Sequence, residues 1–174
     1  MAWVTPVIRA TGDIITAATW NQDVVGNPNY LHKLLVTPPM IIARRSPQTT
    51  LESGEPSIEL TGIVHDTMPA WGYQPGWNSG QNIYIWLRHP GLYLVFANVI
   101  FDSTTLDFAL RLMRDGSNII AIDQPRRWAG SSGANPTVTV VSDGTTRIHM
   151  QLFGTTNGLV MEAGATLGAI WLGA

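Results

Sequence analysis

The sequence predicts an all-β sandwich or barrel after a short helical segment at the N-terminus. From about residue 40 onward, apolar runs of strand length are separated by turn dipeptides. No stretch in that region has a convincing 3.6-residue period. The chain has 174 residues, which is enough for one ordinary domain with a short appendage.

The run IYIWLRH (83–89) has the alternation of a strand with two different faces. Three aliphatic residues fall on one face, and Tyr84, Trp86 and Arg88 fall on the other. Pro90-Gly91 then suits a turn, because Pro fixes one backbone torsion and Gly accepts positive φ. Another strand is therefore expected from residue 92.

Two Asp-Gly dipeptides lie between alternating apolar runs. Asp115-Gly116 joins FALRLM to NIIAI, and Asp143-Gly144 joins TVTVV to RIHMQLF. Asp-Gly in this setting is a strong hairpin signal, so we expect a β-hairpin at each. Asn157-Gly158 and Gly164 punctuate the last two runs.

The run LYLVFANVIF (92–101) is apolar on both faces, with Asn98 as its one polar residue. A strand with one wet face should alternate polar and apolar residues. Its back is therefore covered either by another layer of its own chain or by a neighbouring copy. Charged residues make up only 13% of the chain, against about 25% in typical soluble domains, which favours an oligomer seam. The face assigned to the seam comprises Tyr93, Val95, Ala97, Val99 and Phe101.

The segments HPGLYLVFANVIF, VVSDGTTRIHMQLF and ATLGAIWLGA resemble the jelly roll of tumour-necrosis-factor and complement-type globular heads. Gly91 and Tyr93 match the Gly-x-Tyr element of those heads. The chain departs from the pattern at Val95, Thr145 and Thr166, where the heads carry an aromatic, an acidic residue and Phe. The resemblance implies a jelly-roll β-sandwich head over residues 41–174 and a compact homotrimer, with the Tyr93 strand near the threefold axis.

The N-terminal segment reads as a short helix. Thr16 is a candidate N-cap, and Thr19 with Gln22 has the alternative capping-box spacing. Pro28 is expected to end the helix, since it disfavours helical torsions at the preceding residue, and a second short turn follows. Helices this short are marginal alone, so we expect residues 1–36 to dock onto another protein, with residues 37–40 as a Pro-rich linker.

This segment also resembles the N-terminal segment of virion proteins of tailed bacteriophages, especially minor tail and fibre-like proteins. The matching residues are Trp3, Gly12, Asp13, Ile15, Thr16, Ala17, Ala18, Asn21, Asn27, Tyr30 and Leu31. The resemblance implies that the segment anchors the chain to other tail or capsid proteins. The residues expected to dock are Ile15, Ala17, Trp20, Val24, Tyr30 and Leu31.

Composition and motifs argue against several other functions. The chain has no Cys, and its four His residues share no metal-ligand spacing. The stretch AGSSGA (129–134) approaches a nucleophile motif but reads as a Gly/Ser loop. A net charge of −2 and the absence of a long apolar run argue against nucleic-acid binding and membrane insertion. We therefore expect no catalytic residues, cofactor or metal.

Aromatic side chains in loop-like stretches are the candidate receptor contacts. Trp and Tyr rings beside Asn, Gln and Asp suit stacking on a sugar. The alternative is that these rings fill the top of the barrel or the trimer seam. The candidate contacts to host cell-wall glycan are Trp71, Tyr73, Trp77, Arg126, Arg127 and Trp128.

Together these observations predict a non-enzymatic structural protein of a phage virion, assembled in the host cytoplasm. Its trimeric knob would be docked by its N-terminus and would contact the host surface. The alternatives are a capsid decoration or head-fibre protein without receptor binding, a carbohydrate-active enzyme, and a cellular complement-like module.

Overall fold

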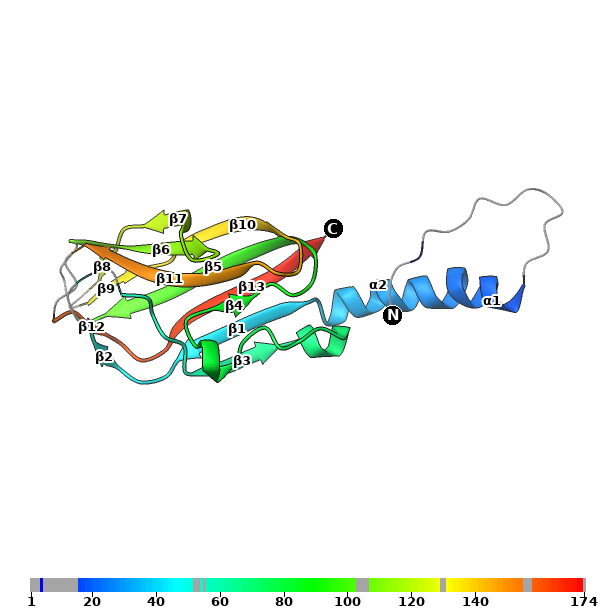
Figure 1. Cartoon of the computed structure of the whole chain (residues 1–174), viewed down its shortest axis with the longest axis horizontal. Coiled ribbons are helices and arrows are strands. Elements are labelled where there is room, and N and C mark those ends of the chain that lie inside the picture. The colour runs from blue at the N-terminus through cyan, green and yellow to red at the C-terminus, as the bar shows by residue number, and fades with distance from the viewer. Residues whose placement is uncertain are drawn as a thin grey trace. The chain divides into compact units, whose positions relative to one another are not determined.

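The computed structural model describes residues 4, 16–51, 54, 56–102, 107–128, 131–154 and 158–173 (Figure 1). Within these ranges, the side chains of residues 23, 24, 127 and 128 are not described. The chain divides into two compact units, Met1–Pro38 and Pro39–Ala174. No helix in the described part of the chain combines the length and the apolar composition required to span a membrane.

The N-terminal unit contains one helical run made of α1 (Ala17–Trp20), the π-helical η1 (Asn21–Gly26) and α2 (Asn27–Val36). Thr16 caps it, as predicted: its side-chain oxygen accepts a hydrogen bond from the Thr19 N–H at 3.2 Å. Asn27 binds the backbone of Val4 in both directions, at 3.1 and 2.8 Å. These two bonds tie the start of the chain to the middle of the helix.

The expectation that Pro28 ends the helix is wrong. The backbone of Gly26 and Asn27 is helical, and Pro28 sits in the first turn of α2. The Asn27 N–H donates to the Gln22 carbonyl, which is the wider i to i−5 bond of a π turn. Proline is tolerated in a helix where neighbouring turns adjust, so the π turn accounts for the uninterrupted run.

The C-terminal unit is a head built from two antiparallel sheets (Figure 1). In the larger sheet, five strands lie in the order β3, β1, β13, β5, β10. Their bounds are Gly62–Asp66, Met40–Arg45, Ala165–Gly173, Gly91–Phe101 and Thr137–Ser142.

Shorter strands extend the far end of the larger sheet. The end of β5 pairs with β9 on one side and with β12 on the other, while β8 pairs with β9 and β2 with β12. Their bounds are Thr49–Thr50 for β2, Arg126–Trp128 for β8, Ser131–Ala134 for β9 and Val160–Met161 for β12. The predicted Gly/Ser loop at 129–134 is thus wrong for its last four residues, because the backbone of β5 offers them a pairing edge.

The smaller sheet has the order β4, β11, β6, β7. The strand bounds are Ile85–Trp86, Arg147–Gly154, Phe108–Arg114 and Asn118–Asp123. Two 3-10 turns, η2 (Met68–Trp71) and η3 (Ser79–Gln81), lie in the connection between β3 and β4. The predicted all-β fold class is confirmed.

One of the two predicted hairpins is confirmed and the other is wrong. Asp115 and Gly116 both have positive φ, at 51° and 93°, and join β6 to β7 as a hairpin. Asp143-Gly144 instead carries the chain from β10 in the larger sheet to β11 in the smaller one. The Asp143 carboxylate accepts hydrogen bonds from the Thr145 N–H and hydroxyl at 2.8 and 2.7 Å, so a local turn motif uses the same dipeptide without pairing the strands.

The core fills the space between the facing sides of the two sheets. From β5 it receives alternate residues, and from β6 and β11 the residues Leu110, Leu112, Ile148 and Met150. Ile58, Leu60 and Met68, from the segments flanking β3, are also buried. Each sheet therefore has one face committed to the interior and one outer face.

Candidate functional site: the outer surfaces of the head

Strand β5 divides its side chains sharply between its two faces. The five side chains assigned to a trimer seam, Tyr93, Val95, Ala97, Val99 and Phe101, are at most 3% exposed and belong to the core of a single subunit. This seam assignment is therefore wrong for that face, because the opposing sheet already covers it.

The hydrogen bonds of Tyr93 also lie within the chain: its O–H donates to the His89 carbonyl at 2.8 Å, and its oxygen accepts from the His89 N–H at 3.2 Å. Burial raises the pKa of the Tyr93 hydroxyl, which stays protonated.

The opposite face of β5 lies on the outside of the larger sheet. Leu92 and Ile100 are exposed on it, and Leu94 and Phe96 are half-buried. No other described element of the head forms a layer over this side of the strand. This surface, together with the matching residues of the neighbouring strands, is called the apolar face below.

The strand register extends the apolar face across the sheet. Ile170 of β13 lies opposite Leu94, and Ile42 of β1 lies opposite Gly168, which in turn pairs with Phe96. On the other side of β5, β10 contributes residues of the same outward set. The outward residues of the neighbouring strands are Met40, Ile42 and Arg44 of β1, Thr137, Thr139 and Val141 of β10, and Thr166, Gly168, Ile170 and Leu172 of β13. Arg44 is the one charged member of this set.

Gly168 allows an aromatic ring to lie against the backbone in the middle of the apolar face. A Cβ atom at this position would lie 2.4 Å from Cζ of Phe96, so the Phe96 ring rests over the glycine. Any side chain at residue 168 would displace the ring. The apolar face is therefore a flat surface in which an aromatic ring lies against the backbone of the next strand.

Three aromatic rings gather around the imidazole of His89. Ring centroids of Trp71, Tyr73 and Trp171 lie 5.9, 5.1 and 5.1 Å from that of His89, all edge-on or steeply inclined. The Trp171 indole N–H donates to the Pro90 carbonyl at 3.0 Å, which fixes one wall. All four rings are half-buried, so part of each stays accessible. Trp71, Tyr73, His89 and Trp171 are called the aromatic cluster below.

The structure brings together only some of the residues predicted to contact glycan. Trp71 and Tyr73 lie in the aromatic cluster, whereas Trp77 is half-buried and packs against the core. Arg126 is exposed on β8, beside β9 (Figure 1). The side chains of Arg127 and Trp128 lie outside the described residues. Sequence reasoning missed His89 and Trp171, whose distance along the chain gave no signal of contact.

The predicted docking residues are distributed over the helical run of the N-terminal unit. Trp20 is 53% exposed, Ala17 and Leu31 are also exposed, and Tyr30 is half-buried. Ile15 and the side chain of Val24 lie outside the described residues.

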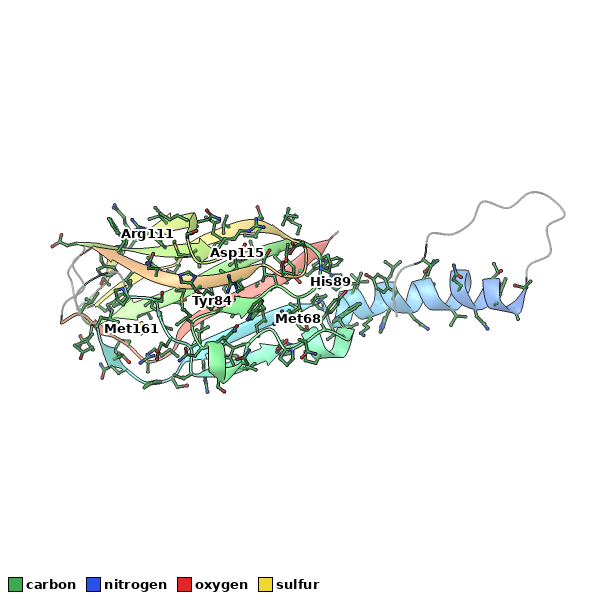
Figure 2. All side chains as sticks on the ribbon, in the orientation of Figure 1. Met68, Tyr84, His89, Arg111, Asp115 and Met161 are labelled. Carbon is green, nitrogen blue, oxygen red and sulfur yellow. The ribbon has the colours of Figure 1, made fainter. Side chains whose placement is uncertain are left out.

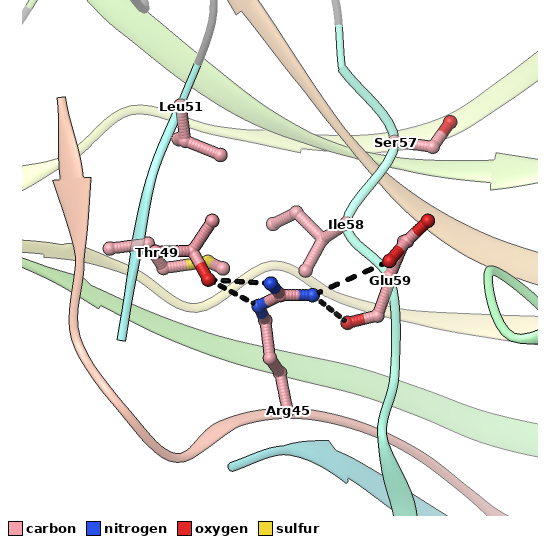
Figure 3. A pocket seen from close by; sticks show the side chains of 7 residues that line it. Arg45, Thr49, Leu51, Ser57, Ile58 and Glu59 are labelled. Carbon is pink, nitrogen blue, oxygen red and sulfur yellow. Dashed lines mark hydrogen bonds and ion pairs between the residues drawn. The ribbon is translucent and has the colours of Figure 1, made fainter. Parts of the chain in front are cut away.

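A pocket lies beside the end of β1 (Figure 3). It has a volume of about 190 Å³ and is lined by Arg45, Thr49, Leu51, Ser57, Ile58, Glu59 and Met161. The Arg45 guanidinium donates to the Thr49 hydroxyl and to the Glu59 carbonyl, and lies 3.8 Å from the Glu59 carboxylate. The N–H donors of Arg45 are thus used in contacts within the head. The residues that line the pocket stabilise the packing of β1 against the neighbouring segments.

His149 is a buried imidazole on the smaller sheet. It lies on the outer side of β11 but is 3% exposed, because the Tyr84 ring packs edge-on against it at 5.0 Å. Burial, with a contribution from the charge of Arg147, holds the pKa of the imidazole below its usual value. Within the described residues, no three His, Asp or Glu side chains converge on a point where a metal ion would bind.

Comparison with known proteins places the fold. No protein-family model and no curated protein sequence matches the chain. Among solved structures, murine APRIL at pH 8.0 superposes with a TM-score of 0.57 at 14% identity, covering 76% of this chain and 98% of that one. The globular domain of zebrafish complement 1qA superposes with a TM-score of 0.56 at 9% identity, covering 77% and 97%. The head therefore has the jelly-roll fold of tumour-necrosis-factor and complement-type heads, as predicted.

Proposed function

We propose that this protein is a non-enzymatic structural component of a tailed-phage virion, in which three copies assemble through the apolar face. The observation that carries the assembly is the bare, nearly charge-free outer face of the larger sheet. Leu94, Phe96 and Ile170 occupy its middle. Contiguous apolar patches of this kind on a soluble head mark protein–protein contacts. A contact between identical copies also accounts for the low charge content of the chain.

The trimer is tested by light scattering on the full-length protein. Leu94→Lys would place a charge in the middle of the contact, and the expected mass is that of a monomer, because burying an unpaired ammonium costs several kcal/mol, on the order of the whole contact. Ile122→Lys, at an exposed position of β7 in the smaller sheet, is the matched control and should keep the trimer mass. A monomeric wild-type protein would refute the assembly, and so would a Leu94→Lys protein that stays trimeric.

The N-terminal helical run is proposed to dock the trimer onto other virion proteins, in the tail in preference to the capsid. Support comes from the phage-like order of residues in this segment and from the exposed Trp20 and Leu31. Trp20→Ala should leave the trimer intact but lower the amount of protein in purified particles by about tenfold, if the indole contributes the 1–2 kcal/mol of a typical interface anchor. Gln22→Ala, an exposed polar position of the same run, is the control. Unchanged incorporation of the Trp20 variant would remove the docking role.

Host-surface contact is the proposed role of the aromatic cluster. Half-buried Trp and Tyr rings held at fixed angles suit the apolar face of a sugar. The decoration alternative predicts no glycan binding by the purified protein. A glycan array therefore separates the two, and a flat result with a correctly trimeric protein favours decoration.

A further inference from the structure

The outer face of the smaller sheet carries a stacked row of guanidinium groups and aromatic rings. Arg88 lies over the Trp86 ring, with Cζ 4.0 Å from the centroid. Arg147, which is the cross-strand partner of Trp86, lies 5.5 Å from the same centroid and 5.2 Å from that of Tyr84. We call Tyr84, Trp86, Arg88 and Arg147 the arginine row; of these residues, Figure 2 labels Tyr84.

The geometry of the arginine row is held by the sheet beneath it. Ile85 and Ile148, next to Trp86 and Arg147, are fully buried in the core, so their neighbours must point outward. His149 packs edge-on against Tyr84 and fixes that ring. The members of the row are half-buried, so their positions are set while part of each remains accessible.

Among the described residues, no carboxylate forms a side-chain ion pair with the guanidinium group of Arg88 or Arg147. The Asp115 carboxylate lies beside the row, but it pairs with Arg114 at 3.2 Å and accepts the backbone N–H of Arg147 at 2.9 Å. The Nε–H of Arg88 and the indole N–H of Trp86 are buried without an acceptor. Two guanidinium charges within 5.5 Å of one indole repel each other, and an anion placed between them would remove that cost.

We propose that the arginine row binds an anionic polysaccharide, one that carries carboxylate or phosphate groups on its sugar repeats. Guanidinium groups bind either acid in a bidentate manner, and the exposed parts of Tyr84 and Trp86 offer apolar contact to the C–H face of a sugar. An acidic protein surface is the alternative ligand for guanidinium groups, and the competition with polyglutamate below separates it from the polysaccharide. This site is separate from the aromatic cluster and does not depend on the trimer or on the virion role.

The test is calorimetric titration of the full-length protein with three polymers of similar length at physiological salt. Polygalacturonate supplies carboxylates, poly(glycerol phosphate) supplies phosphates, and dextran is neutral. We expect binding to at least one anionic polymer and none to dextran. The anionic arm that binds more tightly identifies the acid group.

The decisive variant is Arg88→Gln/Arg147→Gln, which should weaken binding at least about tenfold, because charge-assisted hydrogen bonds contribute about 1.5–3 kcal/mol each. Lys33→Gln, which removes a positive charge from the N-terminal unit, is the control and should bind like the wild type. Arg88→Lys/Arg147→Lys keeps the charge but loses the planar stacking and should fall between them. Thermal unfolding of every variant checks the fold.

Three results would overturn the proposal. The first is no binding to either anionic polymer. The second is a comparable loss in the Lys33→Gln control, which would reveal nonspecific charge attraction. The third is displacement of the polysaccharide by polyglutamate at the same concentration, which would assign the row to an acidic protein partner.

Discussion

The outer faces of the two sheets belong to one sandwich but have opposite chemistry. On the larger sheet, the outward residues around Leu94 and Phe96 are mostly apolar or carry hydroxyl groups, with Asn98 as the one amide and Arg44 at the margin. On the smaller sheet, the outward residues include Arg111 and the arginine row. Arginine is costly to bury without a partner, and aliphatic groups are costly to leave in water. The difference supports the proposals that like copies cover the apolar face and that the arginine row takes an anion.

The prediction with the largest expected effect compares two neighbouring residues of β5, one on its inner face and one on its outer face. Phe101→Ala on the inner side of β5 should lower the free energy of unfolding by about 3–5 kcal/mol, because it leaves a cavity against Phe108, whose ring centroid is 4.6 Å away. Ile100→Ala, at the neighbouring outward position, should cost about 1 kcal/mol or less when both changes are made in the monomeric Leu94→Lys protein, where no other copy covers that side of β5. Urea unfolding at one protein concentration measures both. Similar losses would mean that β5 does not separate an inner from an outer face.

A smaller loss of stability is expected when the packing of the Phe96 ring against the backbone of Gly168 is disturbed. Gly168→Ala should displace the Phe96 ring and cost about 1–3 kcal/mol as an overpacked contact. Adding Phe96→Ala to Gly168→Ala should restore most of the lost free energy of unfolding, because the ring that clashes with the new Cβ atom is then absent. A double-mutant cycle on unfolding free energies gives the coupling. Additive losses would show that the ring and the glycine do not interact.

The smallest expected effect is a pH dependence of stability that arises from His149 in the smaller sheet. Burial lowers the pKa of His149 below its ordinary value of 6.5, so the unfolded chain binds its proton more readily than the folded one. Stability should therefore decline as the pH falls from about 7.5 through 6.5 toward the folded pKa. His149→Gln should flatten this part of the Tm profile, while His65→Gln, at an exposed position of β3, should not. An unchanged slope in the His149 variant would contradict this assignment.

Much of the fold could be predicted because it rests on local patterns. Alternation located β5, β6, β7, β10, β11 and β13, and Asp115-Gly116 specified a hairpin that the positive φ values confirm. Asp143-Gly144 was misread because a turn dipeptide specifies a reversal of the chain and not which sheet the next strand joins. Pro28 was misread because a π turn is a cooperative adjustment without a residue signature of its own.

The candidate sites were predictable only in part. The two-sided apolar character of β5 identified an unusual strand, but an alternating pattern without a polar face does not say which side meets the opposing sheet. Tyr93 is on the core side because it and its alternate neighbours face the smaller sheet. The arginine row was visible as Tyr84, Trp86 and Arg88 on one face of a strand. Its completion by Arg147 needed the pairing of β4 with β11.

The central position of β5 also limits how the length of this gene can change. Because β5 pairs with β10 and β9 along one edge and with β13 and β12 along the other, its register positions both edges at once. A single-codon insertion or deletion inside it would turn the leucines inward and expose Tyr93 and Phe101. Length variation among descendants of this sequence should therefore accumulate in the connections and be absent from residues 91–101.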